Sequence, residues 1–324
     1  CPFLLIIVVN TCPYTIQYIQ STNKYPPGVY MDRMVNNVIT FVYSVFIIIT
    51  FSVFIFSDSF SAKKFCIITV ITAALVVFTK FQILKNLKVK RTQLFLLITI
   101  VFSIILRISW VYLVKAIPLS DFYTYHTLAG ALADGDILYP KFISLFPHVF
   151  GYSRVLSVVY SLFGQNTANA VVFNIALNIG ILLLIYYIAK TLYDEKTGLV
   201  AAIIYTFWPS QIFYNSLVLT EPFFTFGILL LIAFYLYVLK CFNKTVWKIC
   251  GFSLIGVMAG CLKYIRPAAI ILVLSFIIHF LLLHYKHNPH NKAARKEIIV
   301  RVGLCILLIC TYSVTSKLIL NSIE

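Results

Sequence analysis

Two of the few acidic side chains in this chain stand where they could do chemistry. Asp121 follows the apolar run 92–116 by a few residues, and Glu221 lies between two apolar runs that are joined by almost no loop. Carboxylates inside apolar segments are costly and usually functional, and we extend that expectation to the edges of such segments. Two carboxylates in a cleft can act as a general base and as a group that orients an acceptor or a cation. We therefore expect Asp121 and Glu221 to be catalytic.

Each acid also has a structural explanation that stays open. Asp121 precedes the helical-looking segment 122–133, so it can cap that helix without losing a catalytic role. Glu221 suits the first turn of a helix, where the helix dipole favours negative charge. Asp134 and Asp136 flank a glycine and look like turn residues, so we assign them no chemistry.

Basic side chains expected on the same side of the membrane could hold an anionic ligand. Lys141, Lys263 and Arg266 are candidates for gripping phosphate oxygens by charge-assisted hydrogen bonds. Lys263 and Arg266 can equally be interfacial anchors. Arg107 lies about fifteen residues, or roughly 22 Å, above the start of its apolar run, where it can reach either a phosphate group or the outer headgroups.

The elements that position these residues are predicted to be membrane-spanning helices. The 324 residues are 61% hydrophobic and only 11% charged, far from the composition of a globular domain. The apolar runs are continuous and about 20 residues long, as a helical span requires, whereas a β-barrel would show short alternating segments. We predict an all-α polytopic membrane protein with nine or ten transmembrane helices. The predicted spans are 2–18, 37–57, 65–84, 92–116, 168–189, 198–217, 222–239, 249–264, 267–285 and 299–319.

The net charge of +16 indicates orientation rather than nucleic-acid binding, because the basic residues lie between apolar runs and form no basic domain. Four clusters of Lys and Arg fall in alternate loops, near residues 85–91, 190–196, 240–248 and 286–296, and we place those loops in the cytoplasm. Lys63 and Lys64 fall in a loop on the other side and count against this orientation, but the four larger clusters decide the prediction. The loop 117–167 then faces outside, and its segment 142–163, interrupted by Pro147 and Gly151, is predicted to form interfacial helices.

The residues after the fourth span carry a family resemblance. Ser120-Asp121-Phe122-Tyr123-Thr124-Tyr125-His126, followed by Ala129, Leu132 and Gly135, resembles GT-C glycosyltransferases of the protein O-mannosyltransferase and lipid A aminoarabinose transferase type. Further matching pieces are Leu162-Phe163-Gly164-Gln165-Asn166, Tyr193-Asp194-Glu195-Lys196-Thr197-Gly198, Trp208-Pro209, Thr220-Glu221-Pro222 and Arg266-Pro267. The resemblance covers about residues 92–320. It implies a GT-C-like catalytic domain over 92–324, preceded by N-terminal transmembrane helices over 1–91.

The resemblance implies an inverting enzyme that takes a sugar from a polyprenyl-phosphate carrier and passes it to an acceptor on the outer face of the membrane. In such a site Asp121 is the base and Glu221 a second acid. The carrier phosphate falls to Lys141 and Arg266, and Lys263 and Arg107 are further candidates. Tyr123, Tyr125 and His126 are the acceptor or loop residues. The expected partners are this donor and membrane lipids, with no nucleic acid, and the expected location is the bacterial cytoplasmic membrane.

Two questions stay open at the level of the sequence. The related enzymes often carry an adjacent Asp-Glu pair in the first outer loop, whereas Phe122 follows Asp121 here, so use of a divalent metal is undecided. Such enzymes often continue into a soluble outer domain, so whether this chain is a fragment is also undecided. The competing functions are a secondary transporter or flippase, which needs carboxylates near the bilayer midplane, and a noncatalytic scaffold.

Overall fold

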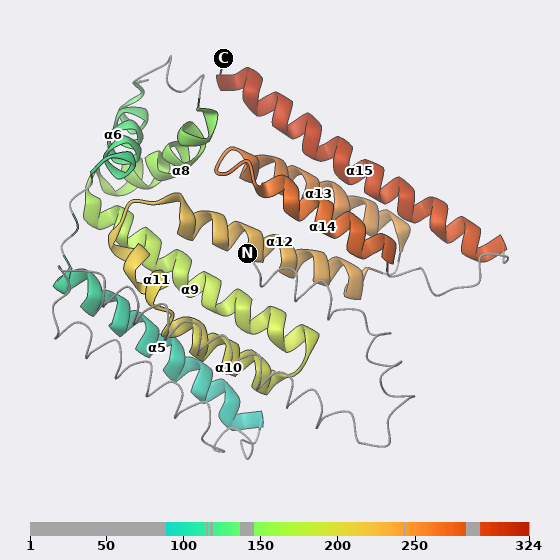
Figure 1. The fold of residues 1–324 in the computed structure, drawn as a ribbon, viewed down its shortest axis with the longest axis horizontal. Coiled ribbons are helices and arrows are strands. Elements are labelled where there is room, and N and C mark those ends of the chain that lie inside the picture. The colour runs from blue at the N-terminus through green and yellow to red at the C-terminus, as the bar shows by residue number, and fades with distance from the viewer. Residues whose placement is uncertain are drawn as a thin grey trace, which may run out of the picture. The chain divides into compact units, whose positions relative to one another are not determined.

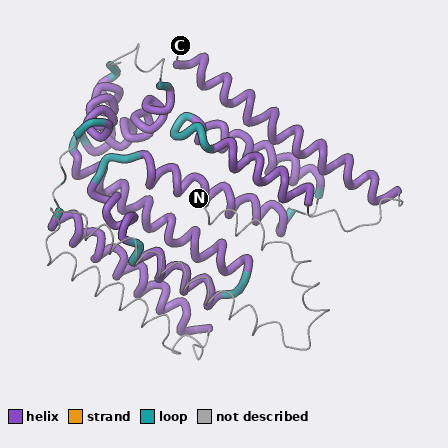
Figure 2. The backbone as a smooth tube through the Cα atoms, in the orientation of Figure 1, coloured by secondary structure: helices purple, strands orange, loops and turns teal. Residues whose placement is uncertain are grey.

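The computed structural model describes residues 89–114, 116, 119–136, 146–242, 244–282 and 292–323. Residues Ile83–Glu324 form one compact unit. Within the described ranges the regular structure is entirely helical, and Figure 2 shows only helices and the loops that join them. The predicted all-α polytopic membrane class is confirmed.

Five of the described helices are long and apolar enough to cross a membrane, and they lie within α5, α9, α12, α13 and α15. The full elements are α5 (Val89–Leu113), α6 (Asp121–Asp134), α8 (Pro147–Phe163), α9 (Thr167–Leu192), α10 (Glu195–Thr206), α11 (Pro209–Phe213), η2 (Tyr214–Ser216), α12 (Thr220–Cys241), α13 (Thr245–Lys263), α14 (Ala269–Leu282) and α15 (Lys292–Ile323). The spans predicted at 2–18, 37–57 and 65–84 lie outside the described residues. The total of nine or ten spans and the division at residue 91 stay predictions.

The predicted span 198–217 is wrong as a continuous helix. α10 ends at Thr206, and the chain turns at Trp208 before the short helices α11 and η2 carry it to Ser216. Pro209 explains the break, because its ring disfavours helical geometry in the residue before it, and Trp208 accordingly has an extended backbone. Hydropathy alone does not reveal this break, because residues 212–213 after it are apolar.

We call the pair of helices α6 and α8 the platform. The two helices pack against each other through aromatic rings that meet edge to face: Tyr125 on Tyr152 at 5.3 Å between ring centres, and His126 on Tyr160 at 5.4 Å. α6 ends at Gly135, whose φ of 90° lies in the left-handed region that a glycine adopts without strain. The interfacial helix predicted within 142–163 corresponds to α8.

Helices α9, α10, α12, α13, α14 and α15 run in alternate directions, so their connections gather at two ends of the bundle (Figure 1). Figure 1 shows α5 ending near the platform, and α11, the start of α12 and the α13–α14 turn lying toward the same end. On the far side of α13, Gly256 and Gly260 lie against α15, where an added Cβ would stand 2.9 Å from the carbonyl oxygen of Leu308 and 3.1 Å from that of Tyr312. Small residues at this spacing let two membrane helices approach closely.

Candidate active site

Glu221 is held at the start of α12 by a partner from the α13–α14 turn. α12 begins at Thr220, so Glu221 lies in its first turn as the sequence indicated. An Nη2 group of Arg266 donates to Oε1 of Glu221, and Nε of Arg266 donates to Oγ1 of Thr220 at 3.1 Å. The guanidinium also lies over the ring of Phe224, 6.0 Å from its centre. One side chain thus fixes two adjacent polar groups of α12.

This ion pair is accessible rather than sealed. The side chain of Arg266 is 41% exposed and that of Glu221 is 27% exposed. A guanidinium has five N–H donors, and the bonds to Thr220 and Glu221 use two of them. Arg266 therefore has donors left for an anionic ligand while it holds Glu221.

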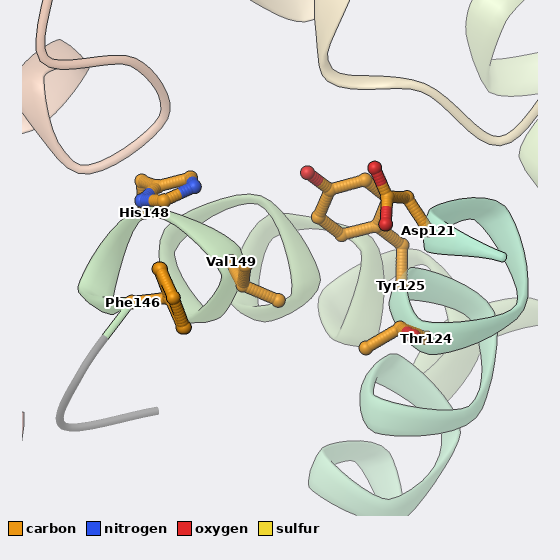
Figure 3. A pocket seen from close by; sticks show the side chains of 6 residues that line it. All are labelled: Asp121, Thr124, Tyr125, Phe146, His148 and Val149. Carbon is orange, nitrogen blue, oxygen red and sulfur yellow. The ribbon is translucent and has the colours of Figure 1, made fainter. Parts of the chain in front are cut away.

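Asp121 stands at the start of α6, beside an open pocket. The structure makes it the first helical residue, and the preceding N-cap residue, Ser120, makes no side-chain capping bond. The pocket has a volume of about 200 Å³ and is lined by Asp121, Thr124, Tyr125, Phe146, His148 and Val149. Figure 3 shows Asp121 and Tyr125 projecting from α6 toward the turn of α8 that carries His148. Carboxylate, hydroxyl and imidazole groups thus border one hollow.

The negative charges of Asp121 and Glu221 both act on the hydroxyl group of Tyr125. Burial raises the pKa of Tyr125, the negative charges of Asp121 and Glu221 raise it further, and the positive charge of Arg266 opposes them. Asp121 and Glu221, 100 residues apart in the chain, therefore lie within electrostatic reach of the same side chain. The structure brings together around Tyr125 the two predicted catalytic acids and one predicted phosphate ligand.

The other predicted acceptor residues lie elsewhere on α6. The imidazole of His126 turns into the platform, with Nδ1 2.7 Å from the hydroxyl oxygen of Tyr160, and burial lowers its pKa. Tyr123 is 56% exposed. Neither residue lines the pocket beside Asp121, whereas Tyr125 does.

The remaining predicted phosphate ligands differ in their surroundings. Lys141 lies outside the described residues. Lys263 ends α13 and is half-buried, three residues before Arg266. Arg107 is fully buried in α5, where its guanidinium carbon lies 5.5 Å from the ring centre of Tyr205. Among the described residues no group of three or more His, Cys, Asp or Glu side chains could hold a metal ion.

Tyr152 is a site residue that sequence reasoning missed. Its ring is fully buried between α6 and α8, and its pKa is raised by burial first, then by the charges of Tyr160, Tyr125 and Glu221. The available signal was the spacing of Val149, Tyr152, Leu156 and Tyr160, which marks one buried face of a helix.

Comparison with known proteins agrees with this architecture. A model of the family described as dolichyl-phosphate-mannose-protein mannosyltransferase matches residues 147–315. The match covers more than half of the chain and includes Glu221 and Arg266, while Asp121 lies before it. Searches of curated proteins and of solved structures found no match. The helical membrane fold and this match show that the chain belongs to the dolichyl-phosphate-mannose-protein mannosyltransferase family, whose members are GT-C membrane glycosyltransferases.

Proposed function

We propose that this membrane glycosyltransferase inverts the anomeric carbon of a sugar as it moves it from a polyprenyl-phosphate carrier to an acceptor on the extracytoplasmic face. The observation that carries the proposal is the gathering of Asp121, Glu221 and Arg266 around Tyr125, next to an open pocket. This arrangement combines two groups. One is a carboxylate that can accept a proton, and the other is a cation that can stabilise a leaving phosphate.

The reaction needs one proton transfer and one displacement. Asp121 accepts the proton of the acceptor hydroxyl, and the acceptor oxygen forms a bond to the anomeric carbon. The bond between that carbon and the carrier oxygen breaks, and the polyprenyl phosphate leaves with the electron pair. Glu221 orients the acceptor or the donor. A sugar hydroxyl or an alcohol is a poor nucleophile at neutral pH, so the positioned base is essential.

The leaving phosphate gains negative charge, which cations must offset. The side chain of Arg266 is partly exposed and has unused hydrogen-bond donors. Lys263 lies three residues earlier, at the end of α13. Lys141 is proposed as a further ligand from the sequence, whereas Arg107 is fully buried within α5. Because the donor is already activated by its phosphate, no nucleotide site is required.

The pocket beside Asp121 is proposed to receive the acceptor. Its volume of about 200 Å³ lies below the roughly 300–1,000 Å³ of pockets that enclose drug-sized ligands, so it fits a single group carrying one hydroxyl. Tyr125 borders the pocket and offers a hydroxyl that stays protonated. Tyr123 and His126 lie on the same helix but do not line the pocket.

The extracytoplasmic location rests on the distribution of positive charge. Lys190, Lys240 and Lys248 lie at the ends of α9 and α12 and the start of α13, opposite the acids. Cytoplasmic loops carry the excess of Lys and Arg, which supports an extracytoplasmic position of the acids. The resemblance to bacterial aminoarabinose transferases supports residence in a bacterial cytoplasmic membrane.

Transfer of radiolabelled sugar from polyprenyl-phosphate donors in membrane vesicles tests the proposal. At matched expression, Asp121→Asn should lower the rate by about 100-fold or more, as loss of a general base does. Glu221→Gln should lower it by about 100-fold because the acceptor or the donor is no longer oriented. Asp134→Asn, on the last turn of the same helix as Asp121, is the control and should transfer normally. A normal rate in Asp121→Asn would remove the assigned base.

The alternative of a secondary transporter or flippase predicts coupling carboxylates near the bilayer midplane. Asp121 and Glu221 instead lie in the first turns of α6 and α12. The position of the acids favours the enzyme.

A further inference from the structure

Three asparagines are fully buried among the apolar helices of the bundle. Asn174 and Asn178 lie four residues apart on one face of α9, and Asn215 lies in η2. Polar side chains in the membrane interior are expensive unless they are hydrogen-bonded, and they usually mark function. The hydrogen-bond partners of the three asparagines therefore indicate their role.

The asparagines tie the segment between α10 and α12 to α9. The amide of Asn178 donates to Oδ1 of Asn215 at 3.1 Å, and the amide of Asn174 donates to the backbone carbonyl of Leu217 at 2.7 Å. The hydroxyl of Tyr205, on α10, donates to Oδ1 of Asn178. The bond from Asn174 satisfies a backbone carbonyl in the irregular segment that follows η2, and an unsatisfied carbonyl would be costly among apolar helices.

Arg107 lies over the ring of Tyr205, and the hydroxyl of the same tyrosine binds Asn178. Its side chain is fully buried, its guanidinium lies over the Tyr205 ring, and its Nη1 group donates to the carbonyl oxygen of Ser103 at 3.3 Å. In the described part of the chain, its Nε and Nη2 groups have no hydrogen-bond partner. A buried cation facing an aromatic ring fixes that ring, and the ring carries the hydroxyl that holds Asn178.

The chain held by this network leads directly to the catalytic glutamate. Leu217, whose carbonyl Asn174 binds, lies three residues before Thr220, and α12 begins there. Since Glu221 is in the first turn of α12, the exit of the chain from η2 sets where its carboxylate points. Arg266 holds the same turn from the opposite side through Thr220 and Glu221.

We infer that Arg107, Tyr205, Asn178, Asn174 and Asn215 form a positioning network that fixes Glu221, with Arg107 a positioning residue rather than a ligand of the donor phosphate. The inference rests on the proposed function only for the role of Glu221. Its structural part is that loss of Arg107 releases the segment 215–219.

A transfer assay separates positioning from phosphate binding. Arg107→Met should lower kcat by about 100-fold, the effect of a misplaced catalytic group, with KM for the donor little changed. In Arg107→Met/Glu221→Gln the loss should be close to that of Glu221→Gln alone, because both changes act on one group. A raised KM for the donor with unchanged kcat, or losses that multiply, would identify Arg107 as an independent ligand and overturn the inference.

A thiol-labelling experiment tests the structural part without any donor. In a chain whose own cysteines are replaced, Val218→Cys puts a thiol at a buried position of the held segment, and Leu156→Cys puts one at a buried position of α8 outside the network. A water-soluble maleimide should leave both thiols unmodified. Adding Arg107→Met should expose the thiol at position 218 at least about tenfold faster and leave the thiol at position 156 protected.

The outcomes distinguish this inference from the proposed function. Continued protection at position 218 overturns the network, whatever the transfer rates, and exposure at both positions shows that Arg107 only supports the fold. Tyr205→Phe is a milder variant that keeps the ring under Arg107 and removes only the hydroxyl, and it should also expose position 218. Absence of transfer by the natural chain with every donor would contradict the proposed function and leave the labelling result standing.

Discussion

In the proposed function Arg266 has two tasks that only an arginine combines. Its planar guanidinium bonds Thr220 and Glu221 through different nitrogens and still has donors for a phosphate. A lysine ammonium carries the charge but is a compact point, and it has no fixed fork that matches two acceptors. The geometry of the side chain is therefore as important as its charge.

Substitution of Arg266 should reveal both contributions. Arg266→Lys is expected to lower kcat/KM about tenfold because the fork is lost, and Arg266→Gln about 100-fold because the charge is also lost and Glu221 is freed. The sugar-transfer assay in vesicles measures both. Arg154→Gln, an exposed arginine on α8, is the matched control. Equal rates for the Gln variant and the natural chain would exclude Arg266 from the site.

The hydroxyl of Tyr152 is a second feature with consequences at the residue scale. It is buried and has no hydrogen-bond partner within the described part of the protein. An unsatisfied buried polar group costs about 1–3 kcal/mol, and removing it recovers that cost. We expect Tyr152→Phe to raise the free energy of unfolding by about 1 kcal/mol at neutral pH, measured by thermal unfolding in detergent.

The same variant should change the response to alkali. Burial holds the pKa of Tyr152 above its usual range, so the unfolded state loses this proton first as pH rises through about 10. The folded state then binds more protons than the unfolded state, and stability falls with rising pH. Tyr152→Phe should show a shallower fall than the natural chain, while the exposed Tyr123→Phe should not differ from it. Parallel curves for all three proteins would contradict this.

At the scale of elements, the contact between the platform and the spanning helices depends on one glycine. A Cβ added at Gly151 of α8 would stand 2.0 Å from the carbonyl oxygen of Tyr264, far inside contact distance. Tyr264 precedes the turn that carries Arg266. The absence of a side chain at position 151 thus lets the helix beside Asp121 approach the turn that holds Glu221.

Gly151→Ala should therefore separate the two halves of the site. The backbone at Tyr264 cannot yield as a flexible side chain would, so α8 must move away, and a shift of about 1 Å can cost roughly 100-fold in rate. Val158→Ala, an exposed position on the same helix, should keep the natural rate in the vesicle assay. Full activity of Gly151→Ala would mean that the platform does not need this contact.

The elements also show what the sequence could and could not predict. The helices around Asp121 and Glu221 were predicted correctly because charges and turn residues bound them. The break at Pro209 was missed because the residues after it remain apolar. The bond between Glu221 and Arg266 joins residues 45 apart, so it depends on how α12 and α13 are rotated, which composition does not encode. Asn174 and Asn178, four residues apart in an apolar run, were a visible signal of the buried network.

At the scale of the whole molecule, the site end and the opposite end of the bundle should lie on different sides of the membrane. α8 is at the site end, and Thr245 begins α13 at the other end. In a cysteine-free chain, a thiol introduced by Arg154→Cys should react with an impermeant maleimide in intact cells. A thiol introduced by Thr245→Cys should react only after permeabilisation. The reverse pattern would place the acids in the cytoplasm.

The pocket beside Asp121 is built entirely from α6, α8 and the residue that precedes α8. Glu221, by contrast, comes from the spanning helix α12, and Arg266 comes from the α13–α14 turn. With the proposed roles of the two parts, such a division allows modular evolution: mutations in the hairpin of α6 and α8 can change what receives the sugar while the machinery for the carrier is inherited intact. Descendants of one ancestral transferase can then diverge in their products without having to reinvent their chemistry.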